Sequence, residues 1–152
     1  KSKKVVVRSP NATRPWQHVL EPISGYFSIA QNLYQNDKNN GEAFNFGPNT
    51  IENFDVKYLI DKMKFFWENA EYIIEERNKK FLKEANLLKL NCDKAALKLN
   101  WKPVLNFKNT IDYTMSWYLE FYKGKSHSMY DYTCKQIKNY HKQAQKKNLF
   151  WS

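Results

Sequence analysis

The stretch from Val5 to Tyr26 reads VVVRSPNATRPWQHVLEPISGY, and it decides how the rest of the chain is interpreted. Its opening VVV run is β-branched and ends at Ser9-Pro10. Because proline cannot donate to a ladder, this predicts a short terminal or edge strand over Lys3–Arg8. From His18 to about Tyr34 apolar residues recur every three or four positions, which predicts an amphipathic helix. A strand, a polar turn and a helix are therefore expected in this order.

The segment Arg14–Pro22 carries the first candidate binding residues. The guanidinium of Arg14 stays charged, and its planar fork of donors suits a pair of phosphate oxygens. A helix start just beyond it adds backbone donors and the positive end of the helix dipole. His18 could donate to a phosphate or a ribose hydroxyl, or it could pack on Trp16. Arg14 could equally pair with Glu21, so a phosphate clamp and a structural loop both remain open.

Helices and short strands alternate along the rest of the chain. Apolar runs beside turn residues predict three more strands: Ala43–Phe46, Tyr72–Ile74 and Leu87–Leu90. Apolar stripes at helical spacing, with capping residues, predict four more helices: one after the N-cap Asn53, one over Asp93–Leu99 after Asn91, one from Asn106 to about Lys123, and one over Met129–Lys147. Four brief strands are too few for a doubly wound nucleotide-binding sheet. We therefore expect an α/β lobe of helices with a few short strands.

Length and composition fit a single partial domain over residues 1–152, with residues 129–152 as a basic C-terminal helix or tail. The chain starts at Lys1 rather than at a methionine, so we expect a piece of something longer. It has neither a long apolar run nor a signal sequence, which predicts a cytoplasmic protein without a membrane segment. Cys92 and Cys134 lack metal-ligand spacing, so free thiols and no metal site are expected.

The formal net charge of +10 raises an alternative function. A basic, aromatic-rich module could bind nucleic acid or an acidic partner through the lysines of residues 129–152. The excess is lysine rather than arginine, whereas a nucleic-acid footprint concentrates charge on one face and uses arginine freely, so we do not expect nucleic acid as a partner. The binding module stays as the alternative to an enzyme fragment.

Three segments carry a resemblance to a known family: RPWQHVLEP at Arg14–Pro22, FNFGP at Phe44–Pro48 and EANLLKLNCDKAALKLNWKP at Glu84–Pro103. Together they closely resemble the C-terminal substrate-binding lobe of CDP-glucose 4,6-dehydratases, within the extended short-chain dehydrogenase/reductase superfamily. The chain departs from the family pattern at Asn91, where an acid is usual, and at Asn100, where a glycine is usual. Asparagine can cap a helix and can adopt the left-handed conformation, so the fold is expected to persist in a diverged member.

The resemblance implies a lyase that converts CDP-glucose to CDP-4-keto-6-deoxyglucose and water, for the dideoxysugars of bacterial surface polysaccharide. It implies NAD as cofactor and a homo-oligomer for the full-length family. Candidate substrate-binding residues are Arg8, Arg14, His18, Asn45 and Glu84. Asn45 would contact the nucleotide sugar or its phosphate, or would satisfy a buried turn. Glu84 would face a ribose hydroxyl or the base, and Arg8 would either share a cleft with Arg14 or pair with a carboxylate.

The family's catalytic parts are not evident in this sequence. Its cofactor loop is glycine-rich, whereas the four glycines here are scattered at positions 25, 41, 47 and 124. Two Tyr-x-x-x-Lys strings, Tyr34–Lys38 and Tyr58–Lys62, are interpreted as chance matches to the family's catalytic pair. We expect no catalytic residue and no NAD binding in this chain alone, and an N-terminal Rossmann portion as its missing partner. If Ala43–Phe46 is one strand of an incomplete sheet, its open edge predicts dimerisation, aggregation or a partner segment.

Overall fold

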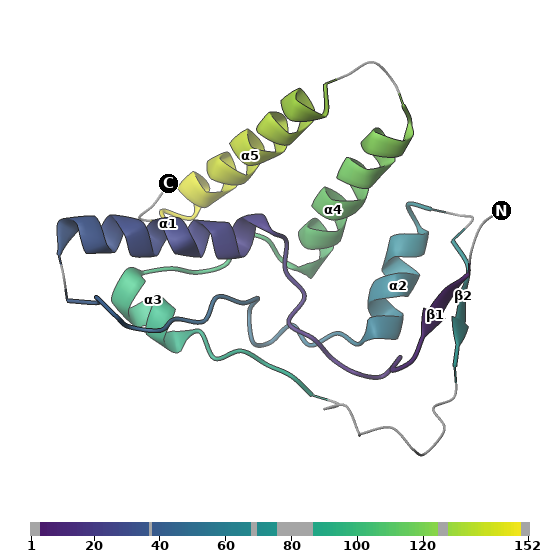
Figure 1. The fold of residues 1–152 in the computed structure, drawn as a ribbon, viewed down its shortest axis with the longest axis horizontal. Coiled ribbons are helices and arrows are strands. Elements are labelled where there is room, and N and C mark those ends of the chain that lie inside the picture. Colours follow the sequence, from purple (N-terminus) through teal and green to yellow (C-terminus); the bar gives the residue numbers. More distant parts are fainter. Residues whose placement is uncertain (1–3, 37, 68–69, 76–86, 125–127, 150–152) are drawn as a thin grey trace. The chain divides into compact units, whose positions relative to one another are not determined.

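The computed structural model describes residues 4–36, 38–67, 70–75, 87–124 and 128–149 (Figure 1). They fall into two compact units. The first comprises Lys1–Pro15 and Asn53–Lys89, and the second comprises Trp16–Glu52 and Leu90–Ser152. Each unit is described by itself below.

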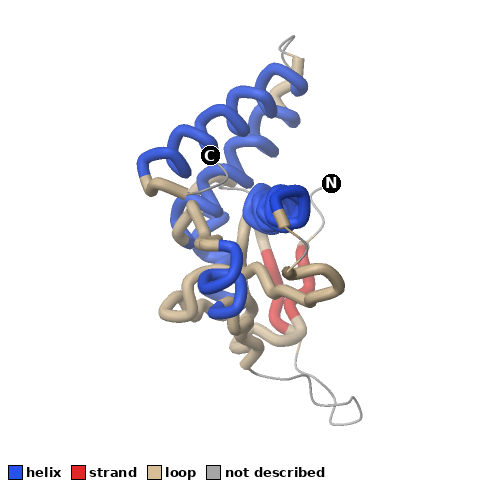
Figure 2. Tube along the Cα trace, turned by 90° about the vertical axis from the view of Figure 1, so that its left-hand side faces the viewer, coloured by secondary structure: helices blue, strands red, loops and turns tan. Residues whose placement is uncertain are grey.

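The first unit holds a small parallel sheet and one helix. Strand β1 (Val5–Val7) pairs with strand β2 (Tyr72–Ile74) in the register Val5 to Tyr72 and Val7 to Ile74. Figure 2 shows the two strands in red. Both confirm the predicted strands. Helix α2 (Val56–Lys64) lies between them in sequence, as is usual for a connection between parallel strands.

Helix α2 starts later than the sequence suggests. Its N-cap is Asp55, whose carboxylate accepts from the backbone N–H of Tyr58 at 2.7 Å, so the prediction of Asn53 as N-cap is wrong. Asp55 has the extended backbone that an N-cap requires, and it also forms an antiparallel bridge with Thr13. The bridge fixes where the loop ends and the helix begins.

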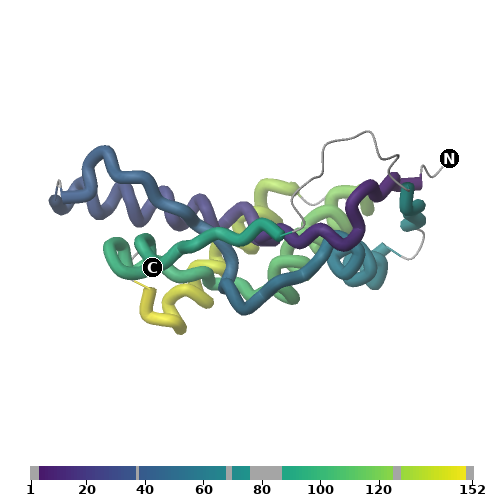
Figure 3. Tube along the Cα trace, turned by 90° about the horizontal axis from the view of Figure 1, so that it is seen from below, coloured from purple at the N-terminus to yellow at the C-terminus, as the bar shows by residue number. Residues whose placement is uncertain are grey.

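The second unit is helical. It comprises α1 (Leu20–Gln35), α3 (Asp93–Leu99), α4 (Phe107–Tyr122) and α5 (Met129–Lys146), which confirm the predicted helices in this part of the chain. Helices α4 and α5 lie side by side as a hairpin (Figures 1 and 2). Figure 3 shows α3 alongside α1. None of the helices described here is long and apolar enough to cross a bilayer.

Two apolar clusters form the core of the second unit. One joins the segment after α3 to α5 and contains Val104, Leu105, Tyr140, Ala144 and Leu149. The other joins the loop before residue 47 to α3 and contains Phe46, Ala95, Leu99 and Trp101. Gly25 of α1 lies against the second cluster, since a Cβ atom there would stand 2.5 Å from the ring of Phe46.

Ala43–Phe46 and Leu87–Leu90 are not strands, which corrects two predictions. Both segments are extended loop. In the first, the carbonyl of Phe46 accepts from the side chain of Gln17 at 3.0 Å, and its ring packs edge-on against Trp101. The apolar run therefore reflects a buried ring rather than a paired strand. Because Ala43–Phe46 is not a strand, it has no open strand edge from which dimerisation could be predicted. The oligomeric state stays a prediction.

Two predicted asparagines lie at helix boundaries of the second unit, Asn106 before α4 and Asn100 after α3, whereas the N-cap of α3 is Cys92 and not the predicted Asn91. The side chain of Asn106 accepts from Asn109 N at 2.9 Å and caps α4. Asn91 accepts from Asp93 N at 2.9 Å just before α3, and Asn100 ends α3 in the left-handed conformation with φ of 50°. Asn91 thus holds the turn just before α3, and Asn100 takes the left-handed conformation common after a helix end.

Candidate functional site

Two of the candidate residues, Arg8 and Arg14, belong to the first unit. Arg8 is exposed just after β1, and Arg14 is half-buried and donates from Nη1 to the carbonyl of Thr13 at 2.7 Å. The pairing of Arg14 with Glu21 stays a prediction. The carboxylate of Glu21 has its own donors within the second unit, described below.

His18 is a candidate residue of the second unit. It is buried at the start of α1, where the N–H of Leu20 donates to its Nδ1 at 3.3 Å. Its ring meets Tyr113 edge-on at 5.6 Å between centroids, which places it on α4 rather than on Trp16. Burial lowers the pKa of His18, so the imidazole is neutral near pH 7. With Nδ1 accepting, the proton of the neutral ring lies on Nε2.

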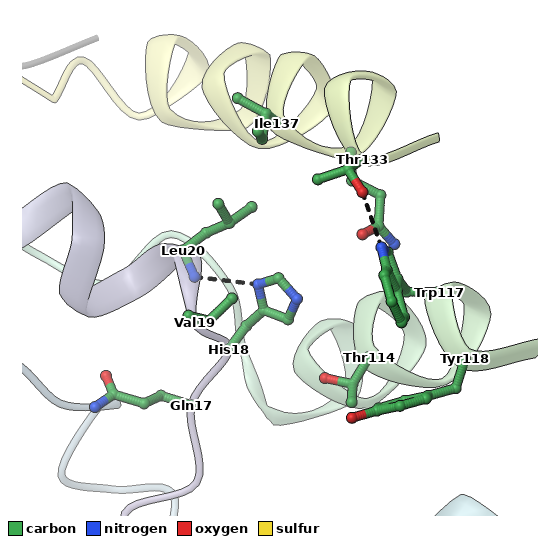
Figure 4. Close-up of a pocket in the computed structure, with 10 residues that line it drawn as sticks. Gln17, His18, Val19, Leu20, Thr114, Trp117, Tyr118, Thr133 and Ile137 are labelled. Atoms are coloured by element: carbon green, nitrogen blue, oxygen red, sulfur yellow. Dashed lines mark hydrogen bonds between the residues drawn. The ribbon is translucent and has the colours of Figure 1, made fainter. Parts of the chain in front are cut away.

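A cavity of about 380 Å³ opens beside His18, between the start of α1, α4 and α5 (Figure 4). This volume lies within the range of small-molecule sites. Trp117 donates from Nε1 to the hydroxyl of Thr133 at 2.9 Å across its wall, and Gln136 donates to the carbonyl of Tyr113 at 2.8 Å. The lining consists of Gln17, His18, Val19, Leu20, Thr114, Trp117, Tyr118, Thr133, Gln136 and Ile137.

Among the described residues that line this cavity there is no carboxylate, lysine or arginine. A phosphate placed there would meet neutral hydrogen-bonding groups only, and burying an unpaired charge is costly. The imidazole N–H, the hydroxyls and the aromatic faces suit an uncharged polar group or ring. The sequence-based expectation that His18 contacts a phosphate therefore finds no support in this lining, whereas contact with a hydroxyl is compatible with it.

Asn45 is exposed, which makes its alternative role in a buried turn wrong. Its Nδ2 donates to the carbonyl of Asn91 at 3.3 Å and links its loop to the segment before α3. Gln17 reaches the same loop through Phe46, so the structure brings the residues before α1 together with the Asn45 loop. Glu84 lies outside the described residues, and its role stays a prediction.

Glu21 is the residue that sequence reasoning missed. Its side chain is 1% exposed, and its carboxylate accepts from Val104 N at 3.1 Å, from Leu105 N at 2.7 Å and from Tyr140 OH at 3.0 Å. Burial raises the pKa of Glu21, and these hydrogen bonds oppose the rise. A signal was available: Glu21, Ser24, Gly25 and Ser28 repeat at helical spacing, and all are buried, which marks a polar buried face of α1.

The glycines do not form a cofactor loop. Gly25 lies inside α1, Gly47 packs against Leu90, and Gly41, in a turn, and Gly124, after α4, have positive φ. A dinucleotide site needs glycines between a strand and a helix N-terminus, where the pyrophosphate binds. These four positions do not fit a dinucleotide. In the part of the chain that the structure describes, no group of His, Cys, Asp and Glu side chains could hold a metal ion.

No family model matches the chain. It is 36% identical over 125 residues to a protein of Salmonella typhimurium named CDP-glucose 4,6-dehydratase, and the match covers 82% of this chain and 34% of that protein. The chain thus spans about a third of the length of this relative. Its fold is similar to the crystal structure of a UDP-glucose 4-epimerase from Stenotrophomonas maltophila with bound NAD and formylated UDP-arabinopyranose. The TM-score is 0.64 at 18% identity, over 80% of this chain and 37% of the epimerase.

The similarity to the epimerase structure is one of fold only, whereas the similarity to the dehydratase is one of sequence. The helices and the two short parallel strands match the C-terminal lobe of an epimerase- or dehydratase-type fold. By sequence, the chain therefore matches about a third of a CDP-glucose 4,6-dehydratase, and by fold it matches part of an epimerase.

Proposed function

We propose that the chain contributes nucleotide-sugar contacts to a CDP-glucose 4,6-dehydratase, a lyase that forms CDP-4-keto-6-deoxyglucose and water. The observation that carries the proposal is the 36% identity over 82% of the chain to a protein of that name. The rest of the enzyme, on this proposal, supplies the catalytic pair and the NAD site. Cytoplasmic location, homo-oligomeric assembly and a role in polysaccharide dideoxysugars form part of the same proposal.

The contacts divide by charge. Arg14, with Arg8, is the proposed contact for the diphosphate, because a guanidinium neutralises and hydrogen-bonds phosphate oxygens together. The cavity beside His18 has a neutral lining, so it would receive an uncharged part of the nucleotide sugar. Asn45 and Glu84 remain proposed contacts of the sugar or nucleoside. No residue of this chain is assigned to hydride or proton transfer.

Ligand titration of the 152-residue chain tests this proposal. Calorimetry should show binding of CDP-glucose and weaker binding of glucose. Arg14→Ala should weaken both CDP and CDP-glucose by about 10- to 100-fold, the effect of losing hydrogen bonds to a charged group. His18→Ala should weaken CDP-glucose by less, about three- to tenfold, as for a neutral hydrogen bond.

Matched controls separate the site from general charge loss. Lys108→Ala removes an exposed cation from α4, and His141→Ala removes an exposed imidazole from α5. Both should bind CDP-glucose as the unaltered chain does. Absence of binding at millimolar CDP-glucose would contradict the proposal. Tight binding of an oligonucleotide that weakens steeply with salt would favour the basic binding module instead.

A further inference from the structure

We infer that the hydrogen bond between Glu21 and Tyr140 sets the width of the cavity beside His18, and that Glu21 is a positioning residue for His18. The inference joins two features of the second unit. One is the buried carboxylate that ties three segments together, and the other is the cavity formed between two of them.

The first step concerns the start of α1. The N-cap position is Val19, whose side chain offers no hydrogen bond to the helix N-terminus. The first turn is instead held by His18 itself, whose carbonyl accepts from Glu21 N at 3.0 Å and whose Nδ1 accepts from Leu20 N. Because His18 and Glu21 share this first turn, the hydrogen bonds that hold the Glu21 side chain also fix the position of His18.

The second step concerns what holds Glu21. Its carboxylate accepts from two consecutive backbone N–H groups, those of Val104 and Leu105, and from the hydroxyl of Tyr140. The same hydroxyl lies 3.1 Å from the Oγ of Ser24, one turn further along α1. Tyr140 is 4% exposed, so these bonds are made away from water, where an unsatisfied partner is costly.

The third step concerns the wall opposite His18. Helix α5 supplies Thr133, Gln136 and Ile137 to the cavity lining, and Tyr140 follows Ile137 on the same helix. The Glu21–Tyr140 bond thus ties the helix that carries His18 to the helix that forms the facing wall. In Figure 4 Ile137 and Thr133 lie on α5, apart from the imidazole, and the Thr133 hydroxyl meets Trp117. Loss of the Glu21–Tyr140 bond frees the two walls to separate and admits water to His18.

The titration of His18 reports this directly. Burial is the cause of its lowered pKa, Tyr113 is the titratable ring packed against it, and Tyr118 lines the same cavity. Tyr140→Phe keeps the ring in the core and removes only the hydroxyl. In this variant the pKa of His18, followed by proton NMR of the imidazole, should rise toward its ordinary value of 6.5. Tyr130→Phe removes an exposed hydroxyl from the same helix and should leave the His18 titration unchanged.

Ligand affinity supplies the second readout, and this arm alone rests on the proposed function. Tyr140→Phe should bind CDP-glucose about three- to tenfold more weakly than the unaltered chain, as for loss of one organising hydrogen bond. Failure of the unaltered chain to bind CDP-glucose would contradict the proposed function while the His18 titration still tests the inference.

The inference is overturned if Tyr140→Phe folds and its His18 titrates as in the unaltered chain. Glu21→Gln keeps an acceptor for Leu105 N and provides a second test with the same expected rise in the pKa of His18. If both variants lose helical circular dichroism, Glu21 serves only the fold, and the positioning role is rejected.

Discussion

Each unit contains a carboxylate that accepts a hydrogen bond from a tyrosine hydroxyl at 3.0 Å, Asp61 from Tyr72 in the first and Glu21 from Tyr140 in the second. Asp61 is half-exposed and also receives Lys57 Nζ at 2.7 Å, which lowers the pKa of Asp61. Glu21 is buried, its other donors are backbone N–H groups, and burial raises the pKa of Glu21. The same pair of groups is therefore exposed to water in the first unit and buried in the second.

The difference shows where the stability of the described residues resides. Hydrogen bonds and ion pairs in water contribute little, because the separated groups are well solvated. Removing a buried carboxylate that accepts from three donors costs much more folding free energy, because the three donors are then buried without an acceptor and without water. The first unit also has few buried apolar side chains, Val7 and Ala12 among its described residues, whereas the second has two apolar clusters.

The largest expected effect separates the two carboxylates. Glu21→Ala should lower the free energy of unfolding of the second unit by about 3–5 kcal/mol, because each stranded buried donor costs about 1–3 kcal/mol. Asp61→Ala should leave the free energy of unfolding of the first unit unchanged within error. Urea denaturation followed by circular dichroism measures both. Equal losses for the two variants would show that burial does not distinguish the two pairs.

A smaller effect tests how tightly the second unit is packed. Gly25→Ala would bring a Cβ to 2.5 Å from the Phe46 ring, so the ring must move. We expect a loss of about 1–3 kcal/mol from overpacking. Adding Phe46→Leu to Gly25→Ala should recover part of this loss if the clash is its cause. Thermal denaturation of the single and double variants decides this, and an unaltered midpoint for Gly25→Ala would mean that α1 and the Phe46 loop are loosely packed.

Helix caps offer a matched comparison of the two units. Asn106 caps α4 through Asn109 N, and Asp55 caps α2 through Tyr58 N. Replacing either by alanine should cost its own helix about 1 kcal/mol. Hydrogen exchange should show faster exchange in α4 for Asn106→Ala and in α2 for Asp55→Ala. Faster exchange spreading from Asp55→Ala into α4 and α5 would show that the units unfold as one.

The smallest expected effect is a difference in pH response. Burial lowers the pKa of His18 below 6.5, so its contribution to stability is present above 6.5 and is lost as pH falls through the folded value. The pKa of Asp61 is lowered below 3.8, so its contribution is lost only in stronger acid. The raised pKa of Glu21 acts in the opposite sense, favouring the folded state below 4.5 and fading as pH rises through the folded value.

Substitution of each histidine checks this response. His18→Gln should reduce the loss of stability in urea between pH 6.5 and pH 5.5, whereas His141→Gln on the exposed face of α5 should retain it. If the two substitutions behave alike, the acid response of the second unit does not come from His18.

Local signals predicted much of this fold. The helix start at Asn106 and the left-handed Asn100 follow from bonds made within a few residues, so both could be predicted from the sequence. Ala43–Phe46 was misassigned because an apolar run looks the same in a strand and in a loop whose ring enters the core.

The candidate site was predictable in part for the same physical reason. His18 and Asn45 proved to lie on segments joined through Gln17 and Phe46, while the sequence offered no local sign of the cavity. The cavity depends on α4 and α5, whose residues lie far along the chain from His18. Glu21 was missed because its partners are equally distant, so only its helical spacing with Ser24 and Ser28 pointed to it.

The distance of those partners has a consequence for how the second unit folds. Val104, Leu105 and Tyr140 lie 83, 84 and 119 residues beyond Glu21. Contacts between residues so far apart in sequence form slowly, because the entropy cost of closing the long loop comes before the stabilisation by the hydrogen bonds. During synthesis Glu21 leaves the ribosome long before its last donor exists. We therefore expect the anchoring of α1 to begin with Val104 and Leu105 and to be completed only after Tyr140 of α5 has emerged.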